Sequence, residues 1–114
     1  MLKGLSGLAE LPNLAKKAHE FQTELSKTVE NLRNIQLEGE SGAGLVKVKI
    51  NGAGNFEKVE VDPSILNKDD KEVIEDLLLA AIKDAQQKAK KYEQREMEKV
   101  AEEAGIPEKF RAPF

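Results

Sequence analysis

The feature that most constrains this chain is a pair of short alternating segments joined at Asn51-Gly52. In VKVKI, before this dipeptide, Val46, Val48 and Ile50 alternate with lysines, and in FEKVEV, after it, Val59 and Val61 alternate with Lys58 and Glu60. This period of two is typical of strands that bury one face, and Asn-Gly is the strongest short hairpin signal. The upstream segment IQLEGES also alternates and is followed by the turn-forming SGAG. We therefore predict a three-stranded antiparallel β-meander over residues 35–61.

Five glycines lie close together in and between these strands, at Gly39, Gly42, Gly44, Gly52 and Gly54. Dense glycines also occur in loops that cradle phosphates. The GxxxxGK[ST] loop needs a lysine and a hydroxyl after its last glycine, whereas GESGAG is followed by Leu45-Val46. A dinucleotide-binding fingerprint opens a helix, and these glycines open a strand. We interpret them as sheet corners, and Gly39 as a bulge or a point of close approach by a second subunit.

Two long segments with helical periodicity flank the meander. The first carries a heptad seam, whose positions recur in alternating steps of three and four: Leu11, Leu14, Ala18, Phe21, Leu25, Thr28, Leu32 and Ile35. Because proline suits the first turn of a helix, we predict a helix over residues 12–33 that packs against another helix. A second helix is predicted over residues 70–104, followed by a flexible tail over residues 105–114.

These elements predict an α+β fold: a long N-terminal helix, a three-stranded antiparallel meander and a long C-terminal helix in one domain spanning residues 1–114. Aromatic residues make up 4% of the chain and charged residues 34%, which leaves little material for a core. Small domains bury too little surface alone, so we expect part of the core to be shared with a second copy. The helices then project from this homodimer as arms.

The residues offer little for catalysis or metal binding. The chain has no cysteine, and His19 is its single histidine, which we interpret as an ordinary helix residue. The acidic cluster at residues 69–76 lacks the spacing of a calcium-binding loop and suits the first turns of a helix. We expect no enzyme activity, no cofactor, no metal and no small-molecule substrate. No apolar run approaches the roughly 20 residues that cross a bilayer, so we expect a cytoplasmic protein without a membrane partner.

A basic stripe on the second helix invites a binding interpretation. Steps of three and four residues place Lys88, Lys91, Arg95 and Lys99 on one helix face, and Lys16 and Lys17 form a smaller candidate on the first helix. A row of cations along a helix can follow a phosphate backbone, even on a protein of net charge −3. The alternative is a solvated face, since Glu93, Glu96 and Glu98 are interleaved at pairing distance.

The chain also resembles a known family. The runs GESGAGLVKVKINGAGNFEKVEVDPSIL and DKEVIEDLLLAAIKDAQQKAKK, together with the opening GLAELPNLAKKAHEFQTEL and the ending GIPEKFRAPF, are similar to the YbaB/EbfC family of bacterial nucleoid-associated proteins. The resemblance covers nearly the whole chain.

The resemblance implies a homodimer whose central sheets form the interface and whose paired helices protrude like tweezers. The candidate interface residues are then Val46, Val48, Ile50, Val59 and Val61. It also implies binding of duplex DNA with weak sequence preference, through the helical arms, and a role at the nucleoid and in gene expression. The candidate contacts are Lys16, Lys17, Lys88, Lys91, Arg95 and Lys99. The alternative function is a scaffold whose helical arms clamp another protein.

Overall fold

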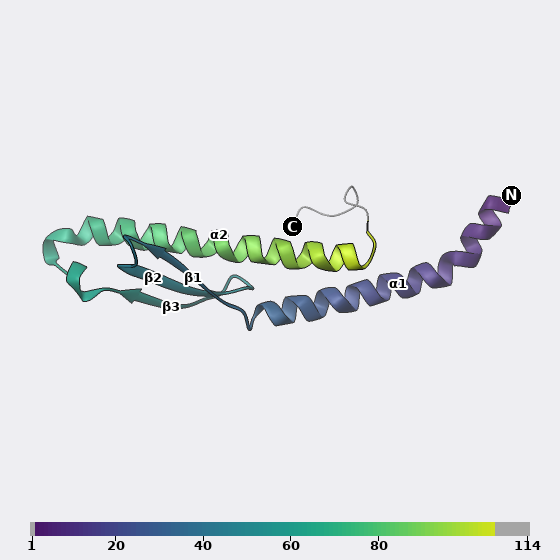
Figure 1. Cartoon of the computed structure of the whole chain (residues 1–114), viewed down its shortest axis with the longest axis horizontal. Helices are drawn as coiled ribbons and strands as arrows, with labels where there is room; N and C mark the ends of the chain where they lie inside the picture. The colour runs from purple at the N-terminus through teal and green to yellow at the C-terminus, as the bar shows by residue number, and fades with distance from the viewer. Residues whose placement is uncertain (1, 107–114) are drawn as a thin grey trace.

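The computed structural model describes the backbone of residues 2–106 and the side chains of residues 11–67 and 69–106. It confirms the predicted helix, three-stranded antiparallel sheet and helix (Figure 1). The elements in chain order are α1 (Leu2–Leu32), β1 (Gln36–Ser41), β2 (Val46–Asn51), β3 (Phe56–Val61), the short 3-10 turns η1 (Pro63–Ile65) and η2 (Lys68–Asp70), and α2 (Lys71–Glu103). The molecule is elongated, with extents of 78 × 24 × 16 Å. The predicted tail lies, from residue 107 on, outside the described residues.

α1 begins earlier than the predicted start at residue 12. It runs from Leu2, and Pro12 lies inside it. A proline within a helix removes one backbone hydrogen bond and bends the helix, but helix can form on both sides of it. In Figure 1 the first third of α1 turns away from the axis of the rest. The helix is therefore about ten residues longer than its proline suggested.

The sheet is a meander in which β2 lies between β1 and β3. Its register pairs Val48 with Gly39 on one side and with Val59 on the other. On the opposite face of the sheet, Lys49 lies between Glu38 and Lys58 and forms an ion pair with Glu60 at 3.6 Å. One face of the sheet is therefore charged, and the other is apolar and available to a helix.

α2 covers the apolar face over β1 and β2. The core consists of three side chains of β2 and three alanines one helical turn apart, namely Val46, Val48, Ile50, Ala81, Ala85 and Ala89. Small side chains on that stripe let the helix approach the sheet closely. The approach is tightest at Gly39, where an added Cβ would meet backbone atoms of Ala81 and Ala85. The close neighbour predicted for Gly39 is thus a helix of its own chain.

The outer edge of β1 is also held by α2. The backbone N–H of Glu40 donates to Oδ2 of Asp84 at 2.9 Å, and Nζ of Lys88 donates to the carbonyl oxygen of Glu38 at 3.0 Å. Asp84 and Lys88 are themselves ion-paired at 3.0 Å. The Ser41 hydroxyl adds a bond to the carbonyl oxygen of Leu77. Three hydrogen bonds thus tie this strand to one helix, and the Asp84–Lys88 ion pair holds two of the side chains that make them.

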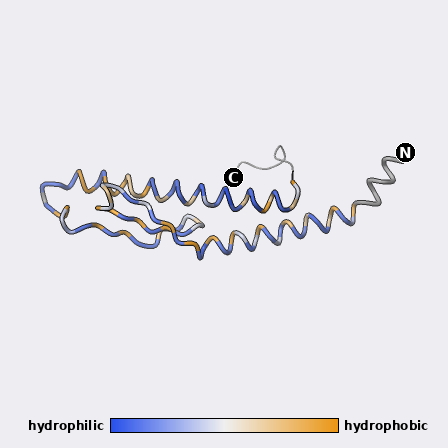
Figure 2. The backbone as a smooth tube through the Cα atoms, viewed as in Figure 1, coloured by the Kyte–Doolittle hydropathy of each residue, from blue (hydrophilic) through white to orange (hydrophobic). Residues whose placement is uncertain are grey.

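α1 leaves the sheet and lies beside the second half of α2. Leu32 is 3% exposed there, and Phe21, Leu25 and Thr28 are half-buried. Towards its N-terminus α1 passes the end of α2 and projects from the body (Figure 1). Figure 2 shows hydrophobic positions recurring along α1, while the second half of α2 is mostly hydrophilic. The heptad seam predicted for α1 therefore packs on α2 only over the second half of α1.

Candidate nucleic-acid interface

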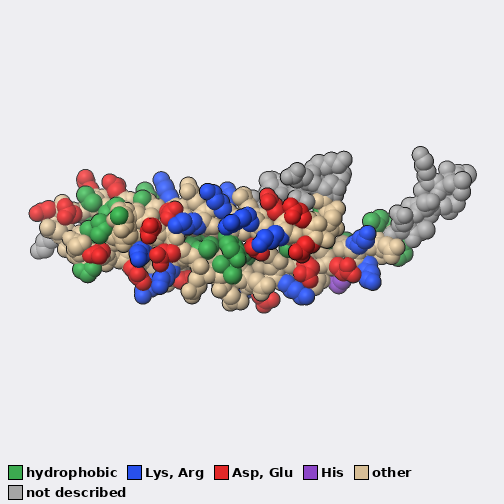
Figure 3. All heavy atoms as spheres, viewed as in Figure 1, with side chains coloured by type: hydrophobic (Ala, Val, Ile, Leu, Met, Phe, Trp, Pro, Cys, Tyr) green, Lys and Arg blue, Asp and Glu red, His purple; other side chains and the backbone are tan. Residues whose placement is uncertain are grey.

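The basic stripe lies on the exposed surface of α2 and begins at Lys88, at the end of the part that covers the sheet. Its four members lie within residues 88–99, which extend over about 16 Å of helix at 1.5 Å per residue, and each is exposed: Lys88, Lys91, Arg95 and Lys99. Figure 3 shows blue side chains gathered along the middle of α2, with red side chains at both ends of that stretch. The helix thus presents a short row of cations rather than a continuous basic surface.

Lys88 is the member of this row whose side chain bonds to the sheet. Its ammonium group is shared between the Asp84 carboxylate and the Glu38 carbonyl oxygen. The bond from the Glu40 N–H and the one from Lys88 hold the pKa of the Asp84 carboxyl below its usual value. A lysine that stabilises an edge strand in this way has less freedom to reach a phosphate.

The other three members of the row differ in what surrounds them. The Arg95 guanidinium lies 5.9 Å from the ring centroid of Tyr92, which holds it by a cation–π contact. Nζ of Lys99 is paired with Glu96 at 3.1 Å, in an exposed i,i+3 bridge of the kind that contributes little. Lys91 forms no ion pair within 4 Å among the described side chains. Lys91 and Arg95 are therefore the cations best placed to meet an external anion.

The two lysines of α1 do not extend this row. Lys17 lies at the junction of the helices, in a groove of about 390 Å³ that it shares with three carboxylates and several small or apolar residues, namely Glu20, Glu24, Glu103, Phe21, Val100, Ala104 and Gly105. Lys16 is exposed on the projecting arm. Lys17 is thus surrounded by carboxylates where the helices meet, and the two lysines of α1 form a basic site separate from the α2 row.

Two residues of this surface were missed by the sequence interpretation. Asp84 fixes Lys88, and Tyr92 supports Arg95. The sequence did contain a signal for both, since Asp84 precedes Lys88 by four residues and Tyr92 precedes Arg95 by three. Both spacings place side chains next to each other on a helix.

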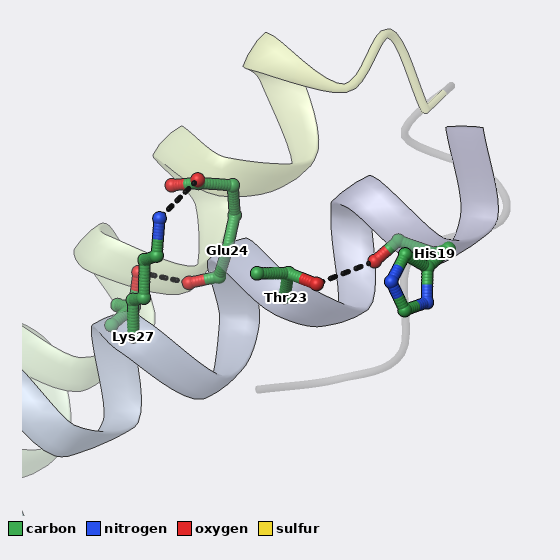
Figure 4. Close-up of polar contacts among 5 residues, drawn as sticks. His19, Thr23, Glu24 and Lys27 are labelled. Carbon is green, nitrogen blue, oxygen red and sulfur yellow. Dashed lines mark hydrogen bonds and ion pairs between the residues drawn. The ribbon is translucent and has the colours of Figure 1, made fainter. Parts of the chain in front are cut away.

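His19 occupies an ordinary position in α1. Figure 4 shows that its carbonyl oxygen accepts a hydrogen bond from the Thr23 hydroxyl, at 2.9 Å, while neighbouring Lys27 and Glu24 form an ion pair at 3.5 Å. Within the described residues, no group of three or more histidine, cysteine or acidic side chains is arranged to hold a metal ion. Neither α1 nor α2, over the stretch described here, is long and apolar enough to cross a bilayer.

The five candidate interface residues lie in different environments. Val46, Val48 and Ile50 have no exposed surface, because α2 covers them. Val61 is half-buried and Val59 is 50% exposed. Only the β3 members therefore have surface to offer to another chain in this arrangement, and Phe56, which is 46% exposed, lies on the same strand.

Comparison with known proteins adds two findings. The model of the YbaB/EbfC DNA-binding family matches residues 8–104, which include both helices and the whole sheet apart from the first turns of α1. Among solved structures, the chain is similar to an uncharacterized protein from Helicobacter pylori, HP0035, with a TM-score of 0.66 and 25% sequence identity. That match covers 75% of this chain and 89% of the other.

Proposed function

The chain belongs to the YbaB/EbfC DNA-binding family, and from this premise we propose that it is a nucleoid-associated protein that binds the phosphate backbone of duplex DNA with little sequence preference. Through this binding it affects nucleoid organisation and gene expression from a cytoplasmic location. The observation that carries the proposal is the row of exposed cations on α2, within a chain of a DNA-binding rather than an enzyme family.

In the proposed mechanism, Lys91, Arg95 and Lys99 contact successive phosphates, and Lys16 and Lys17 add contacts from the α1 arm. Phosphate contacts carry no sequence information, so such binding tolerates many sequences. Each lysine or arginine that neutralises a phosphate releases condensed counterions, so affinity falls steeply as salt rises. Lys88 acts mainly by holding β1 against α2, as its two contacts suggest.

We further propose that the protein acts as a homodimer joined at β3. α2 leaves β3 uncovered, and two apolar side chains of that strand, Phe56 and Val59, are about half exposed. The outer edge of β3 has no neighbouring strand within the described part of the chain. An open edge beside exposed apolar side chains suits pairing with a second copy. A dimer places two basic rows on one particle, which raises the avidity for DNA.

The test is a gel-shift titration of unrelated duplexes at two salt concentrations. Replacing Lys91 and Arg95 by alanine is expected to weaken binding to all duplexes alike and to reduce the slope of log affinity against log salt by about 2. The matched control replaces Lys83 and Lys90, which are exposed on the other side of α2 and carry the same charge.

Equal losses in both double variants would refute the assignment of the row, because they would reflect net charge alone. Salt-insensitive binding, or none at 50 mM salt, would refute the proposed function. Capture of a protein by the helical arms under those conditions would then favour the scaffold alternative.

A further inference from the structure

α1 carries one apolar seam, but α2 covers only part of it. At the end of α2, Phe21 of α1 faces Val100 and Ala104 across the groove between the helices. α1 continues past this point, and Figure 1 shows it projecting alone. On this projecting part Leu11 and Leu14 are 52% and 55% exposed, although they belong to the same heptad seam as the buried Leu32.

This exposed part of the seam has the register of a helix interface. The steps from Leu11 to Leu14, Ala18 and Phe21 are three, four and three residues, which continue the positions that pack on α2. Pro12 directly follows a seam position and so occupies the outer side of the helix, where its ring does not obstruct a partner. Because α2 ends at Glu103 beside this groove, it cannot cover the leucines.

We propose that residues 11–18 of α1 pair with the same residues of a second copy of this chain, as a short antiparallel coiled coil between arm tips. The surface is continuous in register with the α1–α2 interface, and two identical segments give a closed, two-fold contact. In this antiparallel arrangement, Leu11 of one copy packs on Leu14 of the other.

The contact is weak in isolation and depends on tethering. Two half-exposed leucines per copy form a patch far smaller than a stable interface. Molecules held on one DNA, or in one dimer, meet at effective concentrations near the millimolar range, where such a patch can pair. Lys16 lies on the outer side of the helix in this register and stays available to phosphate while the arms are paired. The tethering by DNA rests on the proposed function.

The test uses cross-linking of full-length protein, which has no native cysteine. Leu11→Cys protein is mixed with Leu14→Cys protein under mild oxidation, at high concentration and without DNA. The matched control is Asn13→Cys, exposed on the same turn but outside the seam. The Leu11–Leu14 mixture is expected to cross-link several-fold faster than either variant mixed with Asn13→Cys. Adding Leu14→Ser to the Leu11→Cys protein, or Leu11→Ser to the Leu14→Cys protein, is expected to slow the cross-linking.

Equal cross-linking rates at seam and control positions would overturn the arm pairing. Circular dichroism of each variant confirms that the helices are intact, so a negative result is not a folding failure. Gel shifts of the same proteins are measured separately. Seam-specific cross-linking without DNA binding would refute the proposed function alone, and DNA binding without a seam preference would refute the arm pairing alone.

Discussion

Replacing Gly39 by alanine tests the packing on which the whole arrangement depends. β1 passes directly under α2 at this residue, and a Cβ there would lie 2.5 Å from the carbonyl oxygen of Ala81 and 2.7 Å from Cα of Ala85. Both are backbone atoms, which cannot rotate away as a side chain can. Since ordinary contacts are 3.4–4 Å, α2 must move off the sheet by about 1 Å or the strand must bend.

The loss in free energy of unfolding expected for Gly39→Ala has two contributions. Forcing one extra methyl group into a packed core costs about 1–3 kcal/mol. Moving α2 also loosens the contacts of Val46, Val48 and Ile50, whose full burial is worth about 1.5–3 kcal/mol each, of which a displacement of this size loses a part. We expect Gly39→Ala to lower the free energy of unfolding by about 3 kcal/mol or more, and the melting temperature by roughly 10–20 °C.

The assay is thermal and urea unfolding followed by circular dichroism, at one protein concentration for all variants. Gly54→Ala is the control, because its added methyl group meets no atom within 4 Å. Its φ of +88° is left-handed, so that variant carries only a backbone strain of about 1–2 kcal/mol. If Gly39→Ala is no more destabilising than Gly54→Ala, α2 does not lie over β1 as described.

The remaining predictions concern the β1 edge and the two halves of the α1 seam. Because the pKa of Asp84 is lowered in the folded protein, its contribution to stability is complete above its unfolded pKa and is lost as pH falls through the folded one. Asp84→Asn is therefore expected to lower stability at neutral pH and to flatten the loss on acidification, measured by urea unfolding from pH 7 downwards; an unchanged slope contradicts the assignment. Leu32→Ala should cost about 2–5 kcal/mol because Leu32 is buried, whereas Leu14→Ala on the exposed arm should cost less than about 1 kcal/mol; similar melting temperatures for the two would show that α2 does not cover the seam at Leu32.

The secondary structure was predictable because its signals are local. The alternation on both sides of Asn51-Gly52 gave the strands, and the positive φ angles of Gly42, Gly44 and Gly54 match the sheet corners expected from their glycines. The predicted start of α1 was wrong, because Pro12 is compatible with either the first turn or the interior of a helix. Choosing between them requires knowing whether the preceding residues are helical.

The packing partners were less predictable, since they depend on contacts between distant residues. Alternation identified Val46, Val48 and Ile50 as one apolar face, but it cannot say whether that face meets a helix of the same chain or a second subunit. The alanines at positions 81, 85 and 89 indicated that another element approaches α2 closely. The sequence did not show that this element is the sheet. The same limit applies to Lys88, whose role at the β1 edge joins residues 50 positions apart.

The two outer strands differ in their edges, because side chains of α2 bond to the edge of β1 and leave the edge of β3 open. This difference bears on how many copies of the chain can join one sheet. Asp84 accepts from the backbone N–H of Glu40 and Lys88 donates to the carbonyl oxygen of Glu38, so these two outward groups are not available to an incoming strand. A sheet that can add a strand at β3 alone stops growing once two copies have joined, because their open edges are then consumed. In the proposed dimer, the side chains of one helical turn of α2 would thus favour two copies over the open-ended strand stacking that leads to fibrils.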